Sequence, residues 1–129
     1  MPQRRAFCLC VAMLNAASAH VFVSATPCDM RRGIESLARI VERDLGYDPF
    51  AEATYVFVSR RADKIKMLRW DINGFWLYYK KLSKGTFRWA FRNEEMLLEV
   101  DSRQLSWLID GLAIEQPQAH RPITQRLMF

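Results

Sequence analysis

Side chains that could perform catalysis are few and widely spaced in this sequence. Its two histidines, His20 and His120, stand near opposite ends of the chain. A nuclease that uses two metal ions needs clustered carboxylates, and the candidates are Asp29, Asp63 and Asp71. Each has a simpler role as a helix cap, a loop residue or a turn residue. We therefore predict no catalytic residues and keep a nuclease that uses Asp29 and Asp71 as a third hypothesis.

Motifs for cofactors and metals are also missing from the sequence. It contains no glycine-rich phosphate loop, nucleophile elbow or HExxH pair. Cys8 and Cys10 form a CxC pair without the two further ligands that a zinc site needs. Cys28 makes the cysteine count odd, so no disulfide framework is indicated. We expect no cofactor and no metal site.

Positive charge is concentrated between Arg60 and Arg92. This stretch contains ten Lys or Arg residues and only two Asp, whereas the formal net charge of the whole chain is +5. Tryptophan, tyrosine and phenylalanine alternate with these cations, a pattern typical of a surface that binds a polyanion. The simpler alternative is a solvated sheet face above an aromatic core. With two arginines from an earlier segment, the candidate nucleic-acid-binding residues are Arg31, Arg32, Arg60, Arg61, Lys64, Lys66, Arg69, Lys80, Lys81, Lys84 and Arg88.

The basic stretch itself is predicted to form three strands, at 64–71, 75–82 and 86–92. Asn73-Gly74 joins the first two as a tight hairpin, because both residues tolerate the positive φ of a type I′ turn. Gly85 suits a left-handed position in the second connection. Alternation at period two should place Lys64 and Lys66 on one face. By the same rule, Lys80 and Lys81 must point in opposite directions.

The flanking segments predict two helices and three more strands. Thr26 can cap a helix from Pro27 to Leu45, with apolar residues at helical spacing. Asp101 and Gln104 match a capping box before a second, shorter helix. The additional strands are expected at 21–23, 54–58 and 96–100.

Most connections between these strands are too short for a parallel crossover. We therefore expect an α+β fold with five or six short strands in a mainly antiparallel sheet and with helices packed on one face. A single globular domain should cover 20–112, followed by a mostly unstructured tail at 113–129. Residues 1–19 have the outline of a secretory signal, but an N-terminal extension is the alternative.

Several short motifs along the chain resemble one bacterial transposon family. They are Pro27–Ile34, Asp48-Pro49-Phe50, Val56-Phe57-Val58, Asp63–Lys66, Trp70-Asp71, Gly74-Phe75, Tyr79–Leu82, Gly85, Phe87 and Trp89. Together they resemble the TnpB-type accessory protein of the insertion sequence sixty-six family, which is not the RNA-guided nuclease of the same name. Two features depart from the family pattern: Ala51-Glu52 replaces a Ser-Gly pair, and residues 1–19 are additional.

The resemblance implies a non-enzymatic protein that is encoded beside a DDE-type transposase and supports DNA transposition. It carries no catalytic residues over to this chain. The implied partners are DNA at the element ends and the transposase, in the cytoplasm and without a membrane. Two binding hypotheses follow: the basic sheet contacts DNA, or the aromatic face of the sheet docks on the transposase.

Overall fold

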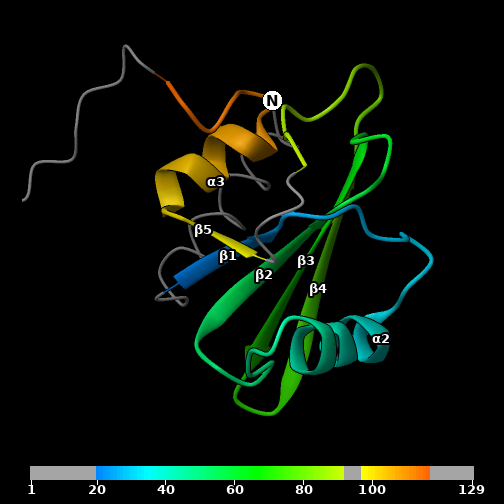
Figure 1. Ribbon diagram of the computed structural model, residues 1–129, viewed down its shortest axis with the longest axis vertical. Helices are drawn as coiled ribbons and strands as arrows, with labels where there is room; N and C mark the ends of the chain where they lie inside the picture. Colours follow the sequence, from blue (N-terminus) through cyan, green and yellow to red (C-terminus); the bar gives the residue numbers. More distant parts are fainter. Residues whose placement is uncertain (1–19, 92–96, 117–129) are drawn as a thin grey trace, which may run out of the picture.

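The computed structural model describes residues 20–91 and 97–116 (Figure 1). These residues form a five-stranded sheet with helical segments in two places. The elements in chain order are β1 (His20–Ser24), α2 (Ile34–Arg39), η1 (Ile40–Asp44), β2 (Ala53–Val58), β3 (Lys64–Asp71), β4 (Gly74–Lys81), β5 (Leu97–Val100) and α3 (Ser102–Ile109). The expected α+β class is confirmed.

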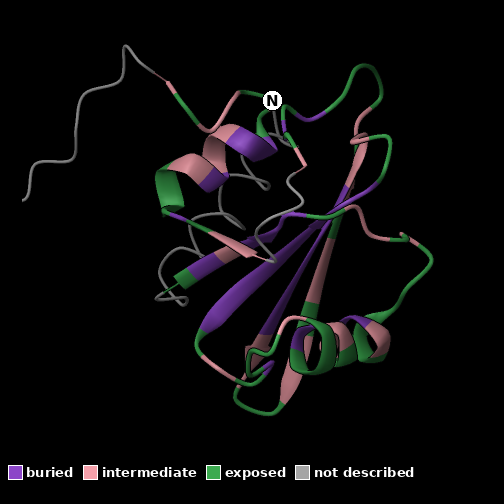
Figure 2. Cartoon of the chain, in the orientation of Figure 1, coloured by how far each residue is buried: buried purple, intermediate pink, exposed green. Residues whose placement is uncertain are grey.

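The strands are ordered β4-β3-β2-β1-β5 across the sheet. β1 and β2 run parallel because the chain crosses over between them through α2 and η1. The other three neighbouring pairs are antiparallel, so the sheet is mainly antiparallel as predicted. β2 is buried at every position, because it lies at the centre of the sheet (Figure 2).

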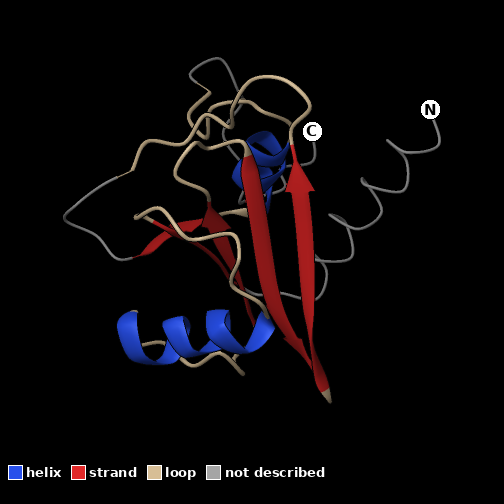
Figure 3. Ribbon diagram, turned by 90° about the vertical axis from the view of Figure 1, so that its right-hand side faces the viewer, coloured by secondary structure: helices blue, strands red, loops and turns tan. Residues whose placement is uncertain are grey.

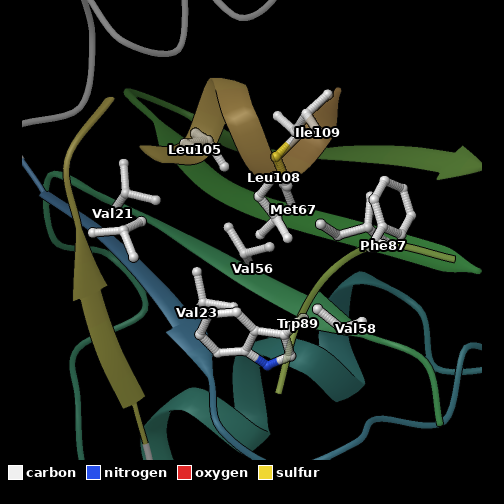
Figure 4. Packing of buried hydrophobic residues seen from close by; sticks show 12 residues of the cluster. Val21, Val23, Val56, Val58, Met67, Phe87, Trp89, Leu105, Leu108 and Ile109 are labelled. Atoms are coloured by element: carbon white, nitrogen blue, oxygen red, sulfur yellow. The ribbon is translucent and has the colours of Figure 1, made fainter. Parts of the chain in front are cut away.

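Both faces of the sheet are covered, each by a different helix. Val21, Val56 and Met67 point to one face and pack with Leu105 and Leu108 of α3 (Figure 4). The alternating residues of the same strands point to the opposite face, where a second cluster forms around α2 and η1. We call these the α3 face and the α2 face. The prediction that the helices pack on one face is therefore wrong, because each strand buries side chains on both sides.

The first helix begins later than predicted. Pro27–Gly33 is a loop, and Gly33 rather than Thr26 is the N-cap of α2. Two interactions hold this loop out of a helix: the Cys28 N–H donates to the carbonyl of Val58, and the Asp29 carboxylate accepts the N–H of Arg31. Local side-chain acceptors of this kind compete with helical hydrogen bonds.

The hairpin between β3 and β4 is confirmed, but its turn is displaced by one residue. Gly74 pairs with Asp71 in the ladder, so the two loop residues are Ile72 and Asn73. Ile72 has a φ of 50° and a side chain exposed to solvent. A β-branched residue rarely adopts this left-handed conformation, which explains why the Asn-Gly pattern placed the turn elsewhere.

The third strand predicted for the basic stretch is wrong over its described residues, 86–91, although its alternation is real. Phe87 and Trp89 are buried in the α3-face core, while Arg88 and Ala90 are exposed. The segment lies outside the sheet, and the N–H of Phe87 donates to the carbonyl of Ala62 in the loop before β3. Alternation at period two indicates only that every second side chain is buried. An irregular segment that crosses the end of a sheet can show the same pattern without pairing to a neighbouring strand.

The second helix agrees closely with its prediction. The Asp101 Oδ1 accepts the Gln104 N–H at 2.7 Å, and the Gln104 side chain accepts the Asp101 N–H at 3.0 Å, which completes the capping box. After α3 the chain has no further helix or strand up to residue 116, but Ile114 packs against the core. Residues 1–19 and 117–129 lie outside the described part. Within that part, no helix combines the length and apolar character required to cross a bilayer.

Candidate functional site

Three loops meet at one end of the sheet, the end from which the parallel strands β1 and β2 exit. The loops are 25–33, 59–63 and 82–86, and we call this region the loop end (upper right in Figure 1). Backbone hydrogen bonds hold this region together: the Cys28 N–H donates to the carbonyl of Val58, the last residue of β2, at 2.9 Å, and the Leu82 N–H donates to the carbonyl of Asp63 at 2.8 Å. Figure 3 shows the β3–β4 turn at the opposite end of the two long strands.

The loop end gathers most of the predicted DNA-binding cations. Lys64 and Lys81 are directly opposite each other in the β3–β4 ladder. Like charges in this relation destabilise a sheet, and the Asp63 carboxylate, 3.7 Å from the Lys64 ammonium, offsets part of this repulsion. With these two lysines, the cations on the loops and their flanking strand ends are Arg31, Arg32, Arg60, Arg61, Lys64, Lys81 and Lys84.

Two carboxylates lie among these cations, and both are engaged. Arg31 holds Asp29 through Nε and Nη2, the latter 2.8 Å from Oδ2. The side-chain hydrogen bonds from Arg31, followed by its backbone N–H, lower the pKa of Asp29 to about 2. Burial acts to raise the pKa of Asp63, but the Ser59 hydroxyl and the Lys64 ammonium outweigh it and lower that pKa. Both groups are therefore ionised at neutral pH, and cations surround them.

A hollow of about 380 Å³ opens between the first two loops. Pro27, Met30 and the half-buried Cys28 line one side, and Ser59 and Arg60 line the other. Burial raises the pKa of the Cys28 thiol, so the thiol is neutral at physiological pH. The hollow therefore combines a small apolar wall with a cationic rim and presents no activated nucleophile.

Four of the candidate cations lie outside the loop end: Arg88 is exposed on the segment that follows it, and Lys66, Lys80 and Arg69 are partly or fully buried on the strands. Lys66 is only 8% exposed, and its Nζ donates to the carbonyl of Met30 at 2.7 Å and to that of Arg32 at 3.0 Å. Lys80 reaches the Ile109 carbonyl at the end of α3 at 2.8 Å. Arg69 is also 8% exposed, and its Nε has no hydrogen-bond partner among the described residues. Alternation places Lys80 and Lys81 on opposite faces, as predicted.

The exposed aromatic residues of the basic stretch do not form one face. Trp76 belongs to the α3 face, where it pairs with Arg69, and it stacks on Tyr78. Tyr79 belongs to the α2 face, where its ring lies over the Lys66 ammonium. Phe50 contributes to a separate group with Trp70 and Phe75 near the hairpin turn. The exposed aromatic residues therefore do not form a single sheet face on which a partner could dock.

The carboxylates of the nuclease hypothesis are far apart. Asp29 is at the loop end, whereas Asp71 ends β3 at the hairpin and accepts a hydrogen bond from Trp76 Nε1 at 3.0 Å. An eight-residue strand spans roughly 25 Å, so the two groups cannot share a metal ion. No cluster of three or more metal-binding side chains occurs in the described ranges.

Sequence reasoning missed the part played by Ser59. Its hydroxyl donates to Asp63 Oδ1 at 3.2 Å and accepts the Lys64 N–H at 3.1 Å, which fixes the loop that carries Arg60 and Arg61. A serine four residues before an aspartate, directly after a strand, was the available signal.

Comparison with protein families gives a match over residues 19–119, to the model described as IS66 Orf2 like protein. The chain belongs to the IS66 Orf2-like family. The predicted resemblance is thereby confirmed, and the protein is an accessory protein of an insertion sequence. Every element of the described fold falls inside the matched range.

Two uncharacterized proteins of Sinorhizobium fredii strain NGR234 are similar to this family member. One, y4hO, is 31% identical over 104 residues, covering 81% of this chain and 90% of its own length. The other, y4jC, is 30% identical over 92 residues, covering 71% and 78%. No solved structure matches the chain.

Proposed function

We propose that this IS66 Orf2-like protein binds DNA through the loop end and thereby supports transposition of its element. One observation carries the proposal: seven cations converge on the three loops and their flanking strand ends, against two carboxylates that are each already paired with one of the seven. Such a concentration of one sign attracts a polyanion and is costly without one. The protein acts by binding and performs no chemistry in this proposal, and it works with the transposase in the cytoplasm.

The loop end is suited to phosphates more than to base edges. Arg60 and Arg61 are exposed on a short loop, and no helix or strand places them for insertion into a groove. Contacts of this kind position a protein on the duplex and carry little sequence information. If about six of these cations neutralise phosphates, the logarithm of affinity should fall against the logarithm of salt with a slope of roughly −5.

The first test is the double substitution Arg60→Glu/Arg61→Glu, measured by fluorescence anisotropy on duplex DNA from an element end. We expect at least tenfold weaker binding at low salt and a slope smaller by about 2, because two phosphate contacts are lost. Circular dichroism should stay unchanged, because both side chains are exposed.

The matched control is Arg39→Glu/Arg43→Glu, which makes the same change in net charge on α2 and η1. Arg39 and Arg43 lie outside the three loops of the loop end, so the control variant should keep its DNA affinity within a few-fold of the unmodified protein. Equal losses in both variants would show that net charge alone drives binding. Full affinity in the Arg60/Arg61 variant would exclude the loop end as the DNA site.

A role in docking on the transposase is the alternative partner hypothesis. A pull-down with the transposase, with and without terminal-repeat DNA, separates the two. Retention that needs no DNA and survives in the Arg60→Glu/Arg61→Glu variant would favour transposase docking over DNA binding.

A further inference from the structure

β4 is an edge strand, and it is unusually long and apolar for that position. Within the described residues β3 lies on one side of it and no strand lies on the other. It is eight residues long, and Trp76 and Tyr79 are 52% and 55% exposed. Proteins normally protect such edges with charge, proline, bulges or short length, because a long apolar edge pairs with other strands. The central part of β4, Phe75–Tyr79, has none of these devices.

The outward hydrogen-bonding groups of β4 follow from the hairpin. In a two-residue loop the flanking residues, here Asp71 and Gly74, form a hydrogen-bonded pair. Backbone direction alternates along a strand, so Phe75, Leu77 and Tyr79 direct their N–H and C=O groups away from β3. A further strand that paired with this edge would form its backbone hydrogen bonds with these three residues.

A second copy of β4 matches this edge when it runs antiparallel about a two-fold axis at Leu77. Leu77 then faces its own counterpart, and Phe75 faces Tyr79 of the second copy. Trp76 likewise faces Tyr78 of the second copy, and every one of these pairs joins apolar or aromatic side chains. Cross-strand pairs of this kind are among the most favourable in sheets. The two-fold axis keeps both α3 faces on the same side, as the pleat requires.

The charges of β4 are also complementary in this arrangement. Both cations, Lys80 and Lys81, lie at one end of the strand. Antiparallel pairing carries them past the hairpin end of the second copy, where Lys80 faces Gly74. Gly74 has no side chain, and beyond it in the same row lies Asp71, the one charged residue between 71 and 79. The charged residue nearest to the lysines in the second copy is therefore a carboxylate, and no lysine faces another.

We propose that the protein forms a two-fold homodimer in which the β4 strands of two copies pair antiparallel about Leu77. The result is one continuous ten-stranded sheet. This interface runs along the β4 edge and places Lys81, at the border of the loop end, beside the hairpin turn of the second copy. It does not depend on DNA binding.

The experiment measures mass by sedimentation velocity and amide hydrogen exchange of the full chain across a hundredfold concentration range. We expect a monomer–dimer equilibrium, with the amides of Leu77 and Tyr79 protected only at high concentration. The substitution Tyr79→Pro removes one outward N–H at an edge that tolerates proline, and it should give a monomer. Tyr79→Ala is its control, because it loses the same ring but keeps the N–H, and it should still form dimers.

The register has its own test. Oxidation of a Leu77→Cys variant should link two copies through residue 77, because a hydrogen-bonded pair brings Cα atoms to about 5.5 Å. A Phe75→Cys variant should not link to itself. A monomer at every concentration overturns the proposal, whether its β4 amides exchange freely or are covered by the same chain. Protection that appears only when transposase is added also overturns it, in favour of a transposase strand on this edge.

Discussion

The Lys66 ammonium lies 2.7 Å from the Met30 carbonyl and joins β3 to the loop that precedes α2. A second contact at 3.0 Å reaches the carbonyl of Arg32. Lys66 therefore holds the loop that carries Arg31 and Arg32 in place, and it supports the site without belonging to its surface.

Replacing Lys66 by methionine should lower the free energy of unfolding by about 1–3 kcal/mol, because two carbonyls lose a charged donor. Urea denaturation followed by circular dichroism measures the change. Lys64→Met is the control on the same face of the same strand, and its side chain is 29% exposed, so we expect about 0.5 kcal/mol or less. Equal effects would mean that the ammonium–carbonyl contacts contribute nothing of their own.

A substitution in the hairpin turn should make the folded protein more stable. Ile72 has a positive φ and is 90% exposed, so its side chain gains little from packing while its backbone is unfavourable. Ile72→Asn should raise the free energy of unfolding by about 1 kcal/mol, since asparagine tolerates this conformation. Ile72→Val keeps the β-branch and should change nothing. A less stable asparagine variant would contradict the left-handed assignment, and thermal unfolding is sufficient to decide.

The cap of α3 gives a third prediction. Asp101→Ala removes the acceptor for the Gln104 N–H and should cost about 1 kcal/mol. Asp110 is the matched control, because it is an exposed aspartate at the C-terminal end of the same helix. There a negative charge opposes the helix dipole, so Asp110→Ala should be neutral or slightly stabilising. Chemical denaturation of both variants tests the pair.

The contact between Arg31 and Asp29 should be visible in a pH titration. In the folded protein the pKa of Asp29 is about 2, below its ordinary value of 3.8, mainly because of the Arg31 hydrogen bonds. Since the folded pKa is depressed, the stabilisation is fully present above the ordinary value and is lost as pH falls through about 2. In Arg31→Gln the carboxyl titration, followed by carbon NMR, should move up toward 3.8. An unmoved midpoint would show that other groups set this pKa.

Local patterns in the sequence predicted most of the individual elements correctly. The hairpin, the Asp101 capping box and the positive φ of Gly85 each depend on residues that are neighbours in the chain. The errors arose where distant segments compete for the backbone. The first helix starts late because the loop at 28–32 forms hydrogen bonds with the Val58 carbonyl and the Lys66 ammonium. Both partners are distant in sequence, so no local pattern contains them.

The same limit applies to the site. Alternation correctly placed Lys64 and Lys66 on one face, but it could not show that the loop before α2 covers only the second of them. The cationic surface was expected on the sheet, whereas the described cations that remain exposed gather mainly on the loops at its end. Contacts between loops decide this, and they form only when the parallel strands β1 and β2 bring their ends together.

The pairing of β1 with β5 also sets an order of events during synthesis. Val21 pairs with Val100, so β1 acquires its second neighbour only after nearly the whole domain has been made. The β3–β4 hairpin, by contrast, closes over two residues and can form while the chain is still attached to the ribosome. A product that stops before Leu97 would leave β1 as a bare edge strand, open to other chains. We expect prematurely terminated chains to aggregate or be degraded, so a nonsense mutation upstream of β5 should remove the protein entirely.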